Sequence, residues 1–448
     1  MKKVLIAALA VIAAVSCKEE KKVTLITVDP AHFHAALVQK SMYPEINPDV
    51  YVYAPEGTDL KAHLARIEDY NNRAEDPTCW NEVVYAGDDF LEKMIAEKKG
   101  NVMVTAGNNR TKPSYIRKAV DAGINVLADK PMAITTEDFE TLKGSFESAQ
   151  KNGVLLYDIM TERFEITSIL QRELSLIPEI YGEQLKGTVE EPAVTKESVH
   201  HFFKNVSGNK LVRPAWYYDV NQEGEGLADV TVHLVDLVQW EVYPDVVLDY
   251  TKDVDMLSAK RWPTIITPAQ YEASTGCKEF PEYLAPCVKN GNLEVYSNGE
   301  MTYRLKDVIA KVVVIWNFEA PAGTGDTHFS IMRGSKADLV IRQGVEQGYK
   351  PELYIEPKGA GEEYGQSVAA KFAELEKNYP GISLEKTDAG WKVAIPESYR
   401  NGHEAHFAQV TKNYLKYLSD GKLPEWEVPN MLAKYYTTTQ AVKKSHEQ

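Results

Sequence analysis

The sequence predicts two domains, an N-terminal α/β domain and a C-terminal α+β domain with a large mixed or antiparallel sheet. From Val23 to about Met160, short β-branched runs alternate with helix-like stretches, which is typical of βαβ units around a parallel sheet. Beyond Thr161 the predicted strands become longer and this alternation ends. With 448 residues, the chain is longer than one hydrophobic core usually supports, so two domains are expected.

The first domain, residues 23–160, is predicted to be Rossmann-like and to bind a dinucleotide. Its strands are expected at 23–28, 50–53, 101–105, 124–128 and 154–157. Helices are expected at 34–39, 113–121 and 136–152, with Gly123 as the stop signal of the second.

The second domain, residues 161–448, is expected to carry helices on one face of its sheet. Its clearest strand candidates are 312–316, 337–341 and 352–355. The closing stretch from Asn401 to Gln448 predicts two helices separated by Gly421 and Pro424. We expect this domain to bind substrate and to mediate any oligomerisation.

The N-terminus predicts export. Two lysines precede an apolar run, residues 4–15, that is too short to span a bilayer, as in a secretory signal. The run ends in Ala14-Val15-Ser16-Cys17, which resembles a bacterial lipobox, so residues 1–17 are predicted to be a lipoprotein signal with Cys17 acylated. The alternative is an ordinary cleavable signal with a chance cysteine. Residues 18–22 would be a polar tether, and the protein would sit on the periplasmic or cell-surface side of a bacterial membrane.

The amino-acid composition limits the kinds of partner that the protein is expected to bind. A net charge of -15 without a clustered basic face argues against nucleic acid and favours a small-molecule ligand. After Cys17, no stretch approaches the roughly 20 apolar residues of a membrane span. Three cysteines remain, and two alternatives stay open: a disulfide between Cys277 and Cys287 with Cys79 unpaired, or three reduced thiols.

The first βα turn lacks the glycines of a dinucleotide-binding motif. Residues 27–34 read Thr-Val-Asp-Pro-Ala-His-Phe-His, and Asp29 places a negative charge where a phosphate would lie. The acidic residue expected after the second strand is represented only by Glu56, displaced by a proline. Taken alone, this turn argues against a nicotinamide cofactor.

A second motif instead favours a nicotinamide cofactor. Asp129-Lys130-Pro131 resembles the Glu-Lys-Pro motif of the Gfo/Idh/MocA family of nicotinamide-dependent oxidoreductases, with Asp in place of Glu. The upstream loop that contains Asn108 and Asn109 is similar to the family's Asn-containing loop. The resemblance implies that Lys130 reaches both the nicotinamide and a substrate hydroxyl, where an ammonium can polarise a carbonyl or stabilise an alkoxide.

A third motif follows about 100 residues later. Residues 226–237 resemble the family's Gly-x-x-Asp-x-Gly-x-His-x-x-Asp-Leu signature, with Thr231 in place of the inner glycine. Asp229 and His233 are four residues apart, so on a helix they would share a face, and the carboxylate could orient the imidazole. The resemblance implies that His233 is the acid/base and Asp229 its partner or a substrate ligand. Asp236 is expected to be structural.

The resemblance spans residues 23 to about 240 and implies NAD or NADP, tightly held. Arg163-Phe164 and Trp216 also match family positions. The predicted cofactor-binding residues are Asp29, His32, Glu56, Asn108, Asn109, Asp129, Lys130 and Arg163. His32 and His34 are expected at the cofactor mouth. No histidine or cysteine set has the spacing of a structural zinc site, so no metal is predicted.

These observations predict an NAD(P)-dependent oxidoreductase that acts on a sugar, glycoside or polyol hydroxyl. Export to a compartment without an evident nicotinamide pool requires the cofactor to be retained. Two alternatives remain open: a redox-neutral enzyme that cleaves or epimerises glycosides with retained NAD, and a non-catalytic sugar-binding lipoprotein. A homo-oligomer is expected by analogy with the family.

Overall fold

The computed structural model describes residues 23–206, 209–359 and 361–447. The predicted signal sequence, the acylation site Cys17 and the tether lie outside these residues and stay predictions. Within the described part of the chain, no helix is both long and apolar enough to cross a membrane.

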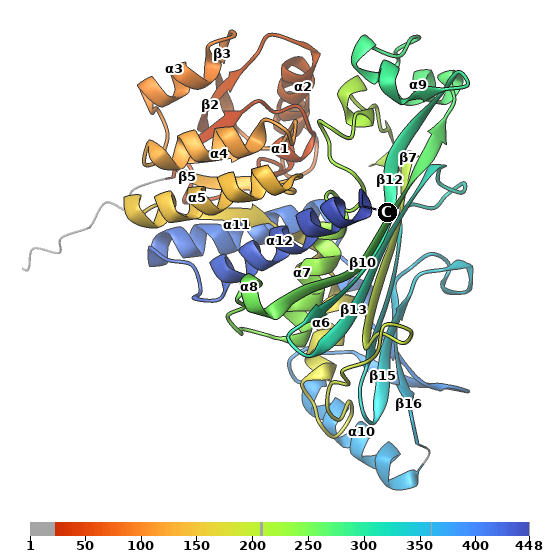
Figure 1. Ribbon diagram of the computed structural model, residues 1–448. Coiled ribbons are helices and arrows are strands. Elements are labelled where there is room, and N and C mark those ends of the chain that lie inside the picture. The colour runs from red at the N-terminus through yellow and green to blue at the C-terminus, as the bar shows by residue number, and fades with distance from the viewer. Residues whose placement is uncertain (1–22, 207–208, 360, 448) are drawn as a thin grey trace, which may run out of the picture.

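A six-stranded parallel sheet forms the first half of the molecule and confirms the Rossmann-like prediction (Figure 1). Its order is β3-β2-β1-β4-β5-β6, and every neighbouring pair is parallel. The strands are β1 (Leu25–Val28), β2 (Asp49–Ala54), β3 (Asn81–Ala86), β4 (Val102–Thr105), β5 (Asn125–Asp129) and β6 (Leu156–Ile159). The helices are α1 (His34–Leu37), α2 (Thr58–Asn72), α3 (Phe90–Glu97), α4 (Lys112–Asp121) and α5 (Thr136–Asn152).

Strand β3 was not among the predicted strands. It lies at the edge of the sheet, and its two valines, Val83 and Val84, are exposed. An edge strand does not need a continuous buried run, so hydrophobic patterning does not reveal it.

A ten-stranded sheet forms the second half, and it is mixed, as predicted. The path β10-β12-β13-β7-β14-β15-β16-β18-β17 contains one parallel pair, β13 with β7, and β11 pairs with β12 at the side. The strands are β7 (Val194–Phe203), β10 (Val254–Ile266), β11 (Val288–Lys289), β12 (Asn292–Leu305), β13 (Val308–Glu319), β14 (Thr327–Arg333), β15 (Ala337–Arg342), β16 (Glu352–Pro357), β17 (Ser383–Thr387) and β18 (Gly390–Ala394). A separate short hairpin pairs β8 (Asn205–Val206) with β9 (Asn209–Lys210).

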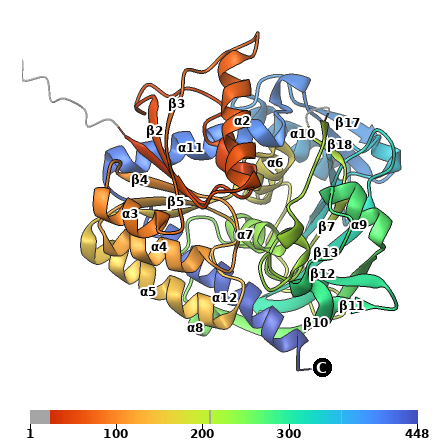
Figure 2. The same cartoon turned by 90° about the horizontal axis from the view of Figure 1, so that it is seen from above.

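Helices fill the space between the two sheets (Figures 1 and 2). They include α6 (Ile166–Ser175), α7 (Thr231–Val242), α11 (His403–Asp420) and α12 (Glu427–Ser445), while α8 (Tyr250–Asp253), α9 (Pro268–Thr275) and α10 (Glu362–Glu376) lie further out. The last two helices return to the first domain: Phe407 and Tyr414 of α11 belong to its core. Helix α12 serves both cores, with Met431 in the first and Ala433 in the second.

A buried ionic network fastens these helices to the first sheet. The Lys434 Nζ of α12 lies 2.8 Å from Asp158 of β6 and 2.8 Å from Asp236 of α7. The Arg163 Nε lies 2.6 Å from Asp236, and its Nη1 lies 3.0 Å from Glu427. All five side chains are nearly or fully buried, so each charge depends on the others for compensation. Asp236 is therefore structural, as expected.

A second buried pair ties α7 to the large sheet. Lys196 of β7 and Glu241 of α7 are 2.6 Å apart, and both side chains are fully buried. Lys196 also donates to Ser330 of β14 at 2.9 Å. Helix α7 is thus held from both sides.

The three described cysteines, Cys79, Cys277 and Cys287, are free thiols. Of the two alternatives for the cysteines, the structure has the reduced one.

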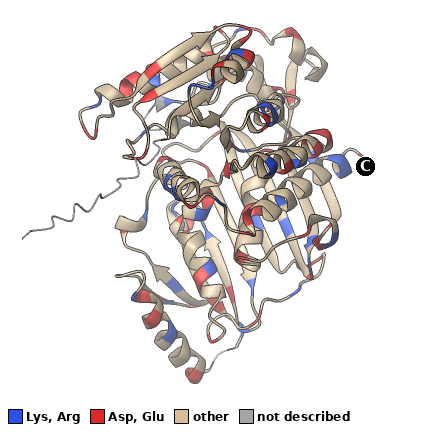
Figure 3. Cartoon of the chain, turned by 90° about the vertical axis from the view of Figure 1, so that its left-hand side faces the viewer, with Lys and Arg blue, Asp and Glu red and all other residues tan. Residues whose placement is uncertain are grey.

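Acidic and basic positions are interspersed along the helices and strands in the view of Figure 3.

Replacing Lys434 by alanine would leave Asp158 and Asp236 buried without their shared cation. We expect a loss of about 3–5 kcal/mol in the free energy of unfolding, measured by denaturant titration. The control is Lys350→Ala, which removes an exposed lysine paired with Glu397 and should leave the transition unchanged. Equal stability of both variants would show that the network does not fasten α12.

Candidate active site

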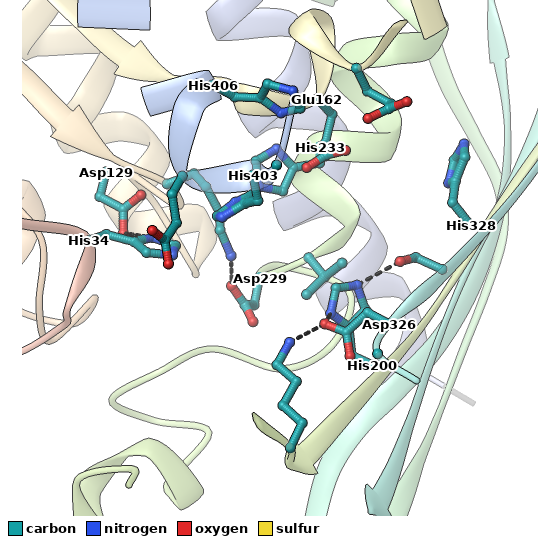
Figure 4. A pocket seen from close by; sticks show the side chains of 18 of the residues that line it. His34, Asp129, Glu162, His200, Asp229, His233, Asp326, His328, His403 and His406 are labelled. Carbon is teal, nitrogen blue, oxygen red and sulfur yellow. Dashed lines mark hydrogen bonds and ion pairs between the residues drawn. The ribbon is translucent and has the colours of Figure 1, made fainter. Parts of the chain in front are cut away.

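A pocket of about 820 Å³ lies between the carboxyl edge of the first sheet and the large sheet (Figure 4). Its walls come from the loops after β1, β4 and β5, from α7, from the start of α11, and from β7 and β14. The first sheet reverses its strand order between β1 and β4, and ligands of such sheets bind at that point. The family-like motifs therefore converge on one cavity.

Lys130 and Asp229 form an ion pair at the centre of this pocket. The Lys130 Nζ lies 2.5 Å from the Asp229 Oδ1, and both side chains are largely buried. Burial opposes the charge on the lysine, but Asp229 and Asp129 outweigh it and raise the Lys130 pKa. Lys130 is thus an ammonium at neutral pH.

His233 lines the same pocket from α7. The expectation that Asp229 orients this imidazole is wrong, because α7 begins at Thr231 and Asp229 precedes it, where its carboxylate pairs with Lys130. Burial and then the charge of Lys130 hold the His233 pKa well below its usual value. Its Nδ1 is buried and has no hydrogen-bond partner among the described residues. The imidazole is therefore neutral, and its residue lines the pocket.

The departure from the family signature at Thr231 has a local explanation. The Thr231 side chain is fully buried, and its Oγ1 donates to the carbonyl groups of Leu227 at 2.5 Å and Gly226 at 3.2 Å. The outer glycine, Gly226, is retained because a Cβ there would lie 2.0 Å from the Ser297 carbonyl oxygen of β12. The turn before α7 is thus fixed by contact with the large sheet.

Asp129 faces two histidines from the first turn. Its Oδ2 lies 3.0 Å from the His34 Nδ1 and 3.6 Å from the His32 Nδ1. Burial lowers the pKa of both imidazoles, so they are neutral at pH 7. Burial alone would raise the pKa of Asp129, but His34, His32 and Lys112 outweigh it and hold the carboxyl ionised. All three predicted residues, Asp129, His32 and His34, line the pocket.

The first βα turn packs closely against the loop after β4, although the turn itself contains no glycine. Asp29 adopts a left-handed backbone conformation with φ of 46°, and Gly107 supplies the close approach, since a Cβ there would lie 2.6 Å from the Asp29 carbonyl oxygen. The backbone N–H groups of Asp29, Ala31 and His32 donate to protein carbonyl groups. These amides are not free for a diphosphate, whereas Lys130 presents its ammonium group to the pocket. The residues fit the nicotinamide end of a dinucleotide better than its diphosphate.

Four predicted cofactor residues lie elsewhere. Asp29 accepts from the Tyr115 hydroxyl at 3.1 Å, and Glu56 is exposed after β2; neither lines the pocket. Asn108 donates to Gln222 at 2.7 Å and also lies outside the pocket lining. Contrary to expectation, Arg163 is not at the pocket, because its guanidinium is engaged by Asp236 and Glu427.

Asn109 connects the two domains beneath the pocket. Its Nδ2 donates to the Glu223 carbonyl group at 2.7 Å and to the Glu223 carboxyl at 3.2 Å, while its Oδ1 accepts from the buried Lys112 at 2.5 Å. Burial and then Asp229 raise the Glu223 pKa well above its usual value. Asn109 thereby places a proton-holding carboxyl beside the Lys130–Asp229 pair.

The wall on the large sheet was not predicted as part of the site. His200 Nδ1 lies 3.0 Å from Asp326, and its Nε2 lies 2.6 Å from the Ser198 hydroxyl. Lys204 also pairs with Asp326, and Trp316 packs against His200 with ring centroids 5.1 Å apart. The alternation of Ser198 and His200 on β7 places both side chains on one face, but the sequence gives no sign that this face meets the first domain.

Three further acid/base groups surround His233. His403 and His406, from the start of α11, have pKa values lowered by burial to about 4. The carboxyl of Glu162 has its pKa raised to about 7 by burial and by the charge of Glu165. Glu162 can therefore exchange a proton at neutral pH beside His233 (Figure 4).

Two family models match the chain. The model described as "Oxidoreductase family, NAD-binding Rossmann fold" (GFO_IDH_MocA) matches residues 51–157. The model described as "Putative oxidoreductase C terminal domain" matches residues 170–446. No curated protein matches the sequence.

Solved structures resemble the whole chain. A "putative oxidoreductase" from Parabacteroides merdae is 58% identical, covers 95% of this chain and 98% of its own, and has a TM-score of 0.94. A levoglucosan dehydrogenase in complex with NADH is 11% identical over 95% and 97% of the two chains, with a TM-score of 0.58. A myo-inositol 2-dehydrogenase from Lactobacillus plantarum is 13% identical over 95% and 98%, with a TM-score of 0.55. The chain belongs to the Gfo/Idh/MocA family of NAD-binding oxidoreductases.

Proposed function

We propose that the protein oxidises a hydroxyl group of a sugar, glycoside or polyol with NAD or NADP. The proposal rests on one observation: a cationic group and a neutral base line the same pocket. Lys130 is held as an ammonium by Asp229, and His233 is held as a neutral imidazole. Oxidation of a carbinol needs both a cation near the oxygen and a base for its proton.

The residues divide the chemistry between them. His233, a neutral imidazole that lines the pocket, accepts the hydroxyl proton. The Lys130 ammonium stabilises the negative charge that develops on the same oxygen. When bound, the nicotinamide supplies the hydride acceptor. Asp229 is a positioning residue that keeps Lys130 charged and aimed into the pocket.

The pocket suits a molecule rich in hydroxyl groups. Its volume of about 820 Å³ accommodates a sugar beside part of a cofactor. The far wall offers the His200–Asp326 pair and Arg213 as hydrogen-bonding groups, with the rings of Trp316 and Tyr217 as apolar surfaces. The names of two structural neighbours, levoglucosan dehydrogenase and myo-inositol 2-dehydrogenase, support the same substrate class.

We also propose that the enzyme is exported and anchored through Cys17, as the lipobox-like N-terminus indicates. A protein in that position needs to keep its nucleotide through many turnovers. Retention also permits a redox-neutral cycle, in which the substrate is oxidised and the product re-reduced on the same enzyme.

The nucleotide provides the first test of the function. Denaturing the purified full-length protein should release close to one equivalent of NAD or NADP, detected by mass spectrometry, or the protein should bind one equivalent on incubation. Substrate turnover in the absence of an external acceptor would favour the redox-neutral cycle. If the protein neither releases nor binds a nucleotide, the oxidoreductase proposal is contradicted, and a sugar-binding protein is the remaining alternative.

Two substitutions test the catalytic roles. Lys130→Met and His233→Asn should each lower kcat by about 10²–10⁴-fold, because each removes a group needed in the transition state. The assay is reduction of NAD or NADP with a panel of sugars, anhydrosugars and inositols. The exposed Lys350→Met serves as control and should keep the parent rate. Parent activity in either pocket variant would assign the chemistry to other residues.

The pH profile separates the roles of Asp229 and His233. Because the His233 pKa is lowered and the Lys130 pKa is raised, kcat/KM should be flat around neutral pH, fall in acid as His233 is protonated, and fall in alkali as Lys130 is deprotonated. Asp229→Asn should move the alkaline limb to lower pH, since Lys130 loses its opposite charge. A shift of the acid limb alone would instead make Asp229 the partner of His233.

A further inference from the structure

We propose that His32, His34 and Asp129 bind one divalent transition-metal ion. The ligand atoms of these side chains all lie within 4.8 Å of one another. Among the residues that the structure describes, they are the one group of three or more His, Cys, Asp or Glu side chains with this spacing. The site lies where the loop after β1 meets the end of β5 (Figure 4).

The two separations between Asp129 and the histidines match a shared ion. Three ligands about 2.0–2.2 Å from one metal, at tetrahedral or octahedral angles, lie roughly 3.0–3.5 Å from one another. The Asp129 Oδ2 lies 3.0 Å from the His34 Nδ1 and 3.6 Å from the His32 Nδ1. Only small side-chain shifts are therefore needed to place an ion between them.

The Asp129 carboxylate lacks a cationic side chain of its own. Among the described residues, the carboxylate contacts the His34 and His32 imidazoles, and no lysine or arginine side chain lies within ion-pair distance. Lys112 donates to the backbone carbonyl group of Asp129, and Lys130 pairs with Asp229. Asp129 is almost completely buried, and a metal ion would add a positive charge in direct contact with its carboxylate, which Lys112 does not provide.

The His32 Nδ1 faces the Asp129 carboxylate at 3.6 Å, just beyond hydrogen-bond distance. This nitrogen is buried and has no hydrogen-bond partner within the described part of the chain. The ring is held edge-on against His34, with centroids 4.0 Å apart, and His34 packs in turn against Phe407 at 4.7 Å. The aromatic packing therefore orients both imidazoles before an ion arrives.

The donor set indicates the class of metal. Two imidazole nitrogens and one carboxylate oxygen favour ions such as Zn²⁺, Fe²⁺ or Mn²⁺ over Ca²⁺, which takes oxygen ligands. Three protein ligands leave coordination positions open, and all three residues line the pocket. An oxygen atom of water or of a bound molecule can complete the shell. The ion would also place positive charge beside a first turn in which the amides of Asp29, Ala31 and His32 already donate to protein carbonyl groups.

The test uses the purified full-length protein, stripped with chelator and titrated with Co²⁺ by visible absorption and with Zn²⁺ by calorimetry. We expect one saturable equivalent. Asp129→Asn and His34→Gln should weaken binding at least about tenfold. The matched control is His200→Gln, because His200 also contacts an aspartate in the same pocket, and its affinity should equal that of the parent.

The ligands can be identified without relying on variants that fail to fold. X-ray absorption of the parent protein loaded with Zn²⁺ should show two imidazole ligands. Absence of saturable binding, unchanged affinity in Asp129→Asn, or a shell without imidazole would overturn the proposal. The measurements need neither nucleotide nor substrate, so their outcome is independent of the oxidoreductase activity.

Discussion

The site depends on the buried charges that hold α7 and α12 between the two sheets. Lys434 bridges Asp158 of the first sheet and Asp236 of α7, and Arg163 joins Asp236 to Glu427. Removing Lys434 or Arg163 would leave buried carboxylates without their shared cation, so these two cations hold the three carboxylates in one arrangement. That arrangement fixes α7, and with it the distance between His233 and the motif that carries Lys130.

The pocket combines histidines held neutral with a lysine held charged. Burial lowers the pKa of His233 and His403, while Asp229 keeps the Lys130 pKa high. The same low-polarity environment thus yields bases and a cation within one cavity, according to which side chains have a carboxylate beside them. Glu162, with its pKa near 7, adds a group that can pass protons onward.

The first turn forms without the glycines of the family motif. Asp29 takes the left-handed conformation that glycine would ordinarily provide, and Gly107 on the neighbouring loop supplies the close approach. Two histidines then occupy the edge of the pocket and face Asp129. The edge of the pocket at this turn therefore presents the His32 and His34 imidazoles and the Asp129 carboxylate.

Local pattern determined much of this protein from sequence alone. The alternation of apolar runs and helices predicted the parallel sheet, α5 was predicted with its observed bounds, and the motifs identified Lys130, Asp229 and His233 as pocket residues. These features depend on neighbours in the chain, which periodicity and spacing record. The tertiary structure alone decided that Asp229 pairs with Lys130, that Arg163 is structural, and that β7 and α11 complete the pocket. Those contacts join residues up to hundreds of positions apart, and no local pattern encodes which buried charge will meet which.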